Sequence, residues 1–323
     1  MRLRGSIERY ATELVALLVV TIWGVNFVFL KAALDEWDPL AFTFVRYVGM
    51  LALSWGVVLA LPRQPGGSRG VARADVGRVA LAGVLGFSCY MLLSIVGLNY
   101  TTAFSNALLL AVAPLFVALL LRGLGAEQVS GRQWLALLVS LAGVVVFLSD
   151  KLADGVGAAS AGDLISLAAA FFFAAYTVTN RPLLTRYSAP RVTAWTLSAG
   201  SLPVLLIAAP SFATQDWSRV SALGWLLVVW AAVVPVYIAW TLWSWVNHRD
   251  GVGRASVFIF LTPLVGGATS WLLLDEGFGP LKAGGALLTL AGLALARRAA
   301  RRASVSAVAN AVSAPALAAA PDG

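Results

Sequence analysis

The sequence predicts an all-α integral membrane protein of ten transmembrane helices, arranged as two inverted five-helix repeats with both termini in the cytoplasm. Three observations support this fold class. The 323 residues are 60% hydrophobic and only 12% charged, whereas soluble domains are about 45–50% apolar and about 25% charged. The apolar residues form ten long runs with basic residues between them, and the second half of the chain repeats the first.

Each apolar run is long enough to cross a bilayer as a helix, which takes about 17–25 residues. We expect helices rather than barrel strands, because the runs do not alternate polar and apolar residues. The predicted spans are 13–33, 39–61, 77–98, 102–121, 132–149, 163–182, 193–210, 222–246, 254–274 and 280–297.

The lysines and arginines predict the direction of the spans. With a cytoplasmic N-terminus, only Lys31, Lys151, Arg219 and Lys282 of the 23 basic residues fall on the outer side. Arg46 lies inside a span, and all the others fall on the inner side. Because cytoplasmic loops carry an excess of Lys and Arg, this bias predicts an even number of spans and a multi-pass protein of the plasma (inner) membrane.

The two halves of the sequence correspond at positions that are 149 or 150 residues apart. The matched pairs are Pro114 with Pro263, Glu127 with Glu276, Glu13 with Asp163, and Lys31 with Arg181. We therefore expect two repeats, 13–149 and 163–297, an outer linker at 150–162, and a disordered cytoplasmic tail at 298–323. Since five spans is an odd number, the second repeat is inverted, as in many secondary transporters with a binding site near the midplane.

Several stretches in order resemble the drug/metabolite transporter superfamily, in particular the EamA-type ten-helix exporters. They are IWGVNFVFLKAAL (22–34), FVRY (44–47), LNYTTAFSNALLLAVAPLFVALL (98–120), GDLISLAAAFFFAAYTVTNR (162–181), LTPLVGGATSWLLLDE (261–276) and AGGALLTLAG (283–292). The resemblance implies a transporter, often an exporter of amino acids or other small metabolites.

The expected function is thus a secondary transporter that exports a small organic metabolite, such as an amino acid or an amphipathic compound, by alternating access. Two alternatives stay open: a non-transporting membrane partner or sensor, and a lipid-modifying membrane enzyme. The enzyme is less favoured, because such enzymes need clustered reactive side chains. No cofactor and no metal site are expected, since His248 is the single histidine. The dispersed arginines also argue against a nucleic-acid partner.

Two prolines are candidates for helix kinks near the substrate path. Pro114 and Pro263 each remove one backbone donor and loosen a helix near the bilayer centre. A carbonyl freed in this way can bind substrate or water, or the kink can serve packing alone. Both interpretations stay open.

The ionisable residues suggest how transport is energised. No Asp or Glu lies in the central part of a predicted span, so a deep carboxylate proton relay is not expected. Transport is predicted to be facilitated, or coupled by means that the sequence does not show. Arg46 either extends outward to pair with Asp35, Glu36 or Asp38, or attracts a carboxylate or phosphate of the substrate.

Lys31 and Arg181 end predicted helices one and six, where a cation acts as a gate, an anchor or a partner of the helix dipole. The better candidates for the cavity wall are mid-span aromatic and uncharged polar residues, together with Arg46. They are Trp23, Asn26, Arg46, Tyr90, Asn106, Tyr176, Trp195, Tyr237 and Trp240. Small residues at 140, 143, 266–268, 284, 285 and 292 favour close contact between helices, or with a second subunit of a homodimer.

Overall fold

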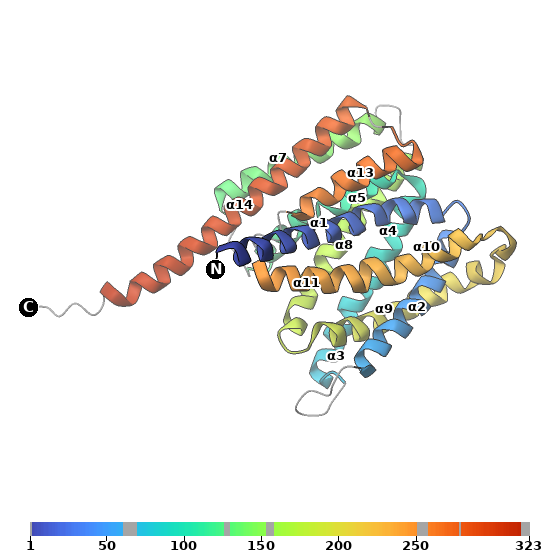
Figure 1. Cartoon of the computed structure of the whole chain (residues 1–323), viewed down its shortest axis with the longest axis horizontal. Helices are drawn as coiled ribbons and strands as arrows, with labels where there is room; N and C mark the ends of the chain where they lie inside the picture. Colours follow the sequence, from blue (N-terminus) through green and yellow to red (C-terminus); the bar gives the residue numbers. More distant parts are fainter. Residues whose placement is uncertain are drawn as a thin grey trace, which may run out of the picture.

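The structure, a computed structural model, describes residues 2–60, 70–125, 130–152, 158–250, 258–277 and 279–317. Within these residues every regular element is a helix, so the all-α prediction is confirmed for this part of the chain (Figure 1). The elements are α1 (Arg2–Ala33), α2 (Pro39–Ala60), α3 (Arg73–Gly83), η1 (Val84–Tyr90), α4 (Met91–Tyr100), α5 (Ala103–Leu110), α6 (Ala113–Gly123), α7 (Gly131–Leu152), α8 (Ala158–Leu184), α9 (Ala189–Thr214), η2 (Trp217–Arg219), α10 (Ala222–Val233), η3 (Val234–Ile238), α11 (Ala239–Asp250), η4 (Phe258–Phe260), α13 (Leu261–Leu274) and α14 (Pro280–Leu317).

Eight helical stretches are long and apolar enough to cross a membrane, and two shorter apolar helices follow them. The eight are Tyr10–Ala33, Pro39–Ala60, Arg73–Tyr100, Ala103–Gly123, Gly131–Ser149, Ala161–Leu184, Ala189–Thr214 and Ala222–Trp243, and the shorter two are Leu261–Leu274 and Pro280–Ala296. Each overlaps one predicted span. The ninth predicted span begins within 251–257, which lies outside the described residues, so the count of ten stays a prediction.

Helix α14 continues far beyond the predicted tenth span and ends at Leu317. The sequence predicted a disordered tail over 298–323, but this segment is helical as far as the structure describes it. Alanine has the highest helix propensity of all residues, so the alanine-rich tail extends the helix after its apolar part ends. The predicted linker, 150–162, contains the end of α7 and the start of α8, and residues 153–157 lie outside the described ranges.

Two spans contain a π-helical segment that the sequence analysis did not predict. The segment η1 separates α3 from α4, and η3 separates α10 from α11. Their first residues, Val84 and Val234, are 150 positions apart, as are residues matched by the repeat. Short π-helical segments inside α-helices are rare and frequently occur at functional sites, so the repeat has placed one such segment in each half.

Both predicted kink prolines follow an interruption of the helix. Pro114 lies in the first turn of α6, after the break that separates α6 from α5. Pro263 lies in the first turn of α13, directly after the 3₁₀ segment η4. A proline is well tolerated at these positions, because the first N–H groups of a helix have no acceptor within it.

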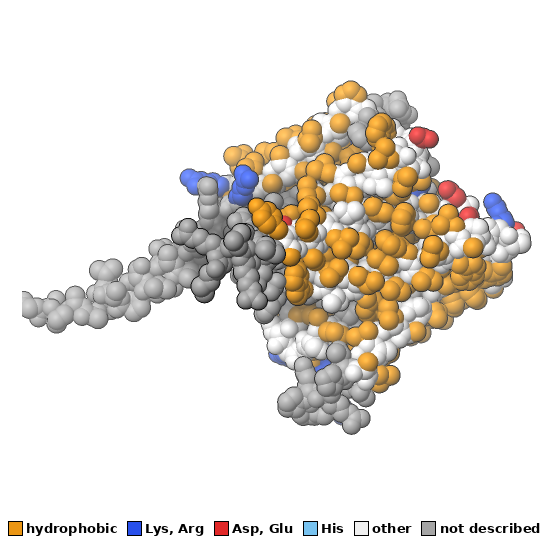
Figure 2. Space-filling view, viewed as in Figure 1, with side chains coloured by type: hydrophobic (Ala, Val, Ile, Leu, Met, Phe, Trp, Pro, Cys, Tyr) orange, Lys and Arg blue, Asp and Glu red, His pale blue; other side chains and the backbone are white. Residues whose placement is uncertain are grey.

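The core lies between the two repeats, because the principal contacts pair a helix of one half with a helix of the other. These pairs are α7 with α14, α2 with α9, α1 with α13, α4 with α8, and α1 with α11. Figure 1 shows α7 and α14 side by side along one edge of the bundle. Apolar side chains cover the middle of the face seen in Figure 2, and red carboxylates gather at its right-hand end.

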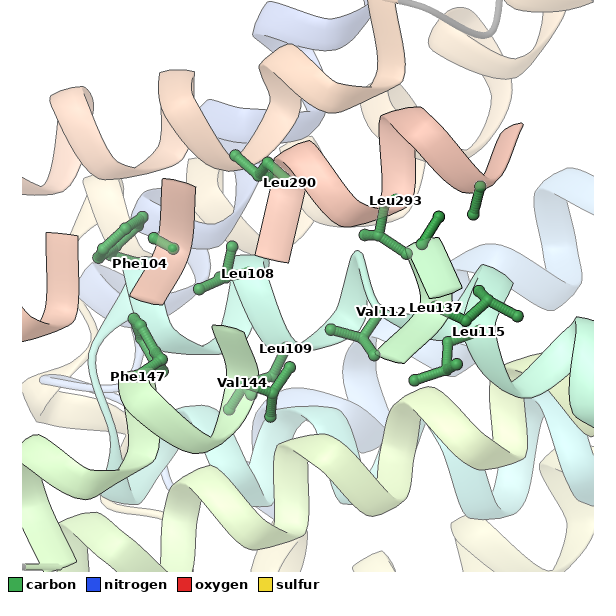
Figure 3. Packing of buried hydrophobic residues seen from close by; sticks show 13 residues of the cluster. Phe104, Leu108, Leu109, Val112, Leu115, Leu137, Val144, Phe147, Leu290 and Leu293 are labelled. Carbon is green, nitrogen blue, oxygen red and sulfur yellow. The ribbon is translucent and has the colours of Figure 1, made fainter. Parts of the chain in front are cut away.

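The largest buried apolar cluster joins the fourth and fifth spans to α14 (Figure 3). Phe104 and Phe147 pack edge to face, with ring centroids 5.8 Å apart. Further along the same cluster, Val112 and Leu137 lie near Leu293 of α14, and all three side chains are buried. This packing holds α7 and α14 together and joins both helices to α5 and α6.

Glycines allow α7 and α14 to approach closely, and this gives a first prediction. A Cβ atom on Gly143 would lie 2.3 Å from the backbone nitrogen of Thr289, whereas a Cβ on Gly284 would have no neighbour within 4 Å. Gly143→Ala should therefore destabilise the protein by about 1–3 kcal/mol through overpacking. Gly284→Ala should stabilise it by up to about 1 kcal/mol through helix propensity. Thermal unfolding in detergent measures both, and equal shifts for the two variants would contradict the close packing.

Candidate functional site

Arg46, the charge predicted inside a span, is buried in α2 with 8% of its surface exposed. Its Nε donates a hydrogen bond to the carbonyl oxygen of Ala231 in α10, at 3.2 Å. Among the described carboxylates none forms an ion pair with Arg46, so the predicted pairing with Asp35, Glu36 or Asp38 is not found. The side chain turns toward α10 instead, because a backbone carbonyl is free to accept there.

Pro235 explains why this carbonyl is free. In a regular helix the Ala231 carbonyl would accept from the N–H of residue 235, and proline has none. The wider turn of η3 also changes the bonding of the Pro235 carbonyl, and this oxygen accepts from Trp23 Nε1 at 3.1 Å. Side chains from α1 and α2 therefore satisfy two carbonyls of one interrupted helix. Pro235 was not among the predicted site residues, although its place in the middle of the predicted eighth span indicated an interrupted helix.

Helix α2 contacts both π-helical segments. The buried Tyr47 hydroxyl donates to the carbonyl of Phe87 in η1. Tyr237 of η3 donates to the Met50 carbonyl at 3.2 Å, and its hydroxyl also hydrogen bonds to Ser54. Tyr47 and Ser54 were not predicted as site residues, because a sequence does not show which hydroxyls meet an interrupted helix.

Two of the predicted aromatic candidates near η3, Trp23 and Trp240, are in contact. Trp23 packs edge-on against Trp240 and Trp243, with ring centroids 6.0 and 5.4 Å apart. Trp240 is 52% exposed, so it lies at the rim of the bundle rather than in its interior. Tyr237 is half-buried.

A second aromatic group surrounds η1. Tyr90 packs against Phe173 at 4.8 Å, and Tyr176 packs against Phe87 at 5.8 Å. The Tyr176 hydroxyl accepts from Asn180 Nδ2 at 3.1 Å. These side chains come from both repeats, because α8 of the second repeat packs against η1 of the first.

Trp195 lies near this second group, on α9. Its ring packs edge-on against Trp55 of α2, with centroids 5.3 Å apart. Trp55 Nε1 donates to Ser198 Oγ at 3.0 Å. The pair therefore fixes α2 against α9.

The two predicted asparagines differ in their bonding. Asn106 is fully buried, and its Nδ2 donates to the Ser94 carbonyl at 3.0 Å and to Ser166 Oγ at 2.9 Å. It thus joins α4, α5 and α8. Asn26 is 8% exposed, and its Oδ1 has no hydrogen-bond partner among the described residues. An unsatisfied buried amide oxygen is unfavourable, so Asn26 is the stronger candidate for binding a ligand.

Lys31 and Arg181 lie at helix ends, as predicted. Lys31 Nζ donates to the carbonyls of Leu98 and Asn99, at 2.8 and 3.1 Å, and so binds the carbonyl end of α4. Arg181 is exposed near the end of α8. The contacts of Lys31 favour its interpretation as an anchor and dipole partner.

A polar contact that we call the first latch joins the α1–α2 connection to the start of α10. The Glu36 carboxylate accepts from the N–H and the hydroxyl of Ser221, at 2.8 and 2.9 Å. Beside it, the Asp38 N–H donates to Gln215 Oε1 at 2.9 Å. A surface cavity of about 340 Å³ opens next to this latch. The first latch therefore closes the two repeats on each other at one end of the bundle.

The second latch joins the α8–α9 connection to the first turn of α3. Arg186 Nη1 and the Tyr187 hydroxyl donate to the Asp75 carboxylate at 2.8 and 2.7 Å. Glu36 and Arg186 are 150 positions apart, as are Trp37 and Tyr187, so the repeat relates the two latches. They lie at opposite ends of the bundle, because α9 runs antiparallel to α2.

Comparison with known proteins assigns the family. The sequence profile of the EamA-like transporter family matches residues 11–149 and 160–298. The chain belongs to the EamA-like transporter family. It is thereby a member of the drug/metabolite transporter superfamily, as the sequence motifs implied, and the family profile occurs twice along the chain.

Several relatives match most of this family member. A "Probable amino-acid metabolite efflux pump" of Escherichia coli (strain K12) is 27% identical over 289 residues, covering 86% of this chain and 92% of the relative. A "Probable terminal-alkyne amino-acid exporter" of Streptantibioticus cattleyicolor is 27% identical, covering 87% and 91%. A solved structure described as "Crystal structure of protein" shares the fold, with a TM-score of 0.59, 20% identity, and coverage of 91% of this chain and 99% of that one.

Proposed function

We propose that this chain is a secondary transporter that exports a small organic metabolite across the plasma membrane by alternating access. In this proposal ten spans form two inverted repeats of five, with both termini in the cytoplasm. The substrate is an amino acid or an amphipathic compound. The observation that carries the proposal is the pair of repeat-related latches at opposite ends of a bundle whose centre is polar and aromatic.

The latches suit alternating access because each joins one repeat to the other. Glu36 holds the start of α10, and Arg186 with Tyr187 holds the start of α3. Opening the first latch would expose the bundle centre at one face, and opening the second would expose it at the opposite face. The proposed cycle opens one latch at a time, which keeps a continuous pore from forming.

The two π-helical segments, η1 and η3, are the hinges in the proposed motion. A π-helical segment contains weaker and fewer regular hydrogen bonds than an α-helix, so it bends at lower cost. The segments η1 and η3 occupy equivalent positions in the two repeats, and α2 contacts both through Tyr47 and Tyr237. A rocking motion of one repeat against the other would therefore bend equivalent points in each half.

The relatives support the direction and the substrate class. Two are named as an amino-acid metabolite efflux pump and a terminal-alkyne amino-acid exporter. In the described spans no carboxylate lies in the central part, and Asp163, although buried, lies close to the start of α8. We therefore propose movement down the substrate gradient, without a carboxylate proton relay.

The test is flux through the purified protein in proteoliposomes. The panel contains amino acids, nucleosides and cationic drugs, each measured with and without a pH gradient, and protein-free vesicles are the control. Saturable flux of a small metabolite without a pH gradient is expected. Absence of flux for every solute, with the fold verified by its thermal unfolding, would refute the transporter and favour a non-transporting membrane partner.

A further inference from the structure

Arg46 places a permanent positive charge deep within the bundle. It follows Pro39, the first residue of α2, by seven positions, which is roughly 10 Å along a helix. Its acceptor Ala231 lies nine positions after the first residue of α10, roughly 13 Å from that helix start. Both depths fall well inside a hydrocarbon core of about 30 Å, so this arginine is not an interfacial anchor.

The contacts of Arg46 leave its charge uncompensated among the described residues. Only its Nε is engaged, by the Ala231 carbonyl. No carboxylate among the described residues forms an ion pair with it, and its neighbour along α2, Tyr47, is a phenol without charge at neutral pH. Burying a cation without a counter-charge is costly, so a bound group that supplies a negative charge would stabilise this arrangement.

The geometry of a guanidinium indicates what that group is. With Nε held by a carbonyl, the two Nη groups remain as a planar fork, which matches the two oxygens of a carboxylate. Because Pro235 has no N–H to offer the Ala231 carbonyl, Nε finds its acceptor there and the two Nη groups remain for a ligand.

Asn26 supplies a second polar atom at the same depth. Trp23 of α1 bonds to the Pro235 carbonyl, and Ala231, four positions before Pro235, is one helical turn away from it along α10. Asn26 is three positions after Trp23 on the same face of α1. Phe29, further along α1, packs against Trp230 with ring centroids 5.1 Å apart, so α1 and α10 run antiparallel and Asn26 lies between these two contacts, at the depth of Ala231. Its buried Oδ1 has no partner among the described residues and can accept from an ammonium group.

We propose that Arg46 and Asn26 form a binding site for zwitterionic amino acids, with Arg46 holding the carboxylate and Asn26 accepting from the ammonium group. This inference rests on the proposed transport function and narrows its substrate class. It makes Arg46 a residue that determines specificity, beyond its contact with α10.

The experiment compares acids with their amides in proteoliposomes. The probes are the twenty protein amino acids, each offered as the free acid and as its carboxamide, together with the corresponding acids that lack the amino group. The wild-type protein should favour at least one free acid over its amide by roughly tenfold or more, the worth of a charge-assisted bidentate contact. Asn26→Ala should reduce the preference for amino acids over acids that lack the amino group.

Arg46→Gln should abolish the preference for acid over amide, and Arg46→Lys should retain part of it. Arg78→Gln, which removes an exposed arginine of α3, is the matched control and should leave the preference unchanged. A purely structural role of Arg46 would lower all fluxes equally and leave the ratio intact, and this result would overturn the inference. So would a wild-type protein without preference in all twenty pairs, even if it transported a cationic drug. Absence of flux for every solute would instead refute the transport function itself.

Discussion

Pro235→Ala is expected to reduce transport at least about tenfold while leaving the protein as stable as the parent or more stable. Alanine restores the N–H that the Ala231 carbonyl lacks, and a proline inside a helix costs about 3 kcal/mol. The helix would then satisfy this carbonyl itself and displace Arg46 Nε, which now donates to it. The carbonyl of residue 235 would also return to the regular helix and no longer accept the hydrogen bond from Trp23 Nε1. Initial flux in proteoliposomes and thermal unfolding in detergent measure the two effects.

Pro203→Ala is the matched control, because Pro203 also lies inside a long helix, α9. The carbonyl four positions before it, that of Ala199, accepts no side-chain hydrogen bond in the described part of the chain. The control should gain stability without losing flux. If both variants retained full flux, η3 would not be required for transport, and a loss of stability in Pro235→Ala would show that the π-helical segment is the preferred conformation there.

Much of the fold could be predicted because membrane spans and repeats depend on simple properties of the sequence. The predicted second span, 39–61, and the helix α2 differ by one residue, since Pro39 and the preceding polar residues fix its start. The repeat was visible because Pro114 and Pro263 keep the same distance from other matched positions. Both prolines follow an interruption of the helix, so the missing N–H of proline marks two of the helix breaks.

The π-helical segments could not be predicted in the same way. Val84–Tyr90 contains no proline and continues an apolar run without a change of period, so its interruption depends on tertiary contacts. One is Tyr47, which donates to the Phe87 carbonyl. Another is Tyr176, whose ring fills the space where a Cβ on Gly86 would lie, 2.5 Å away. Neither contact leaves a pattern in the sequence.

The latches were missed for another reason. Glu36 and Arg186 occupy matched positions in the repeat but carry opposite charges. Because the repeat was recognised from similar residues at matched positions, this pair did not stand out. Their partners also differ, since Ser221 offers donors whereas Asp75 offers a carboxylate. In the proposed inverted arrangement the matched contacts would lie at opposite faces of the membrane, so each would need only a complementary partner at its own face.

Opening either latch by mutation is expected to shift the protein toward opposite conformations. Glu36→Ala removes a carboxylate that accepts two hydrogen bonds from Ser221, and such bonds are worth enough to change the ratio of two conformations by roughly tenfold. Hydrogen–deuterium exchange should then rise at 34–38 and 215–221 and fall at 70–75 and 186–187. Arg186→Ala should produce the reverse pattern, because only one latch at a time is open in the proposed cycle.

Asp216→Asn provides the control within the same connection as the first latch. Its carboxylate accepts from the hydroxyl and N–H of Ser218, which lower the pKa of that group, and both contacts stay within one turn. The variant should change exchange locally at 215–221 and leave the second latch unaffected. The decisive result is the response at the distant face. If Glu36→Ala raised hydrogen–deuterium exchange at its own face and left 70–75 and 186–187 unchanged, the latches would be independent structural contacts. The proposal that the two latches open in turn during alternating access would then be wrong.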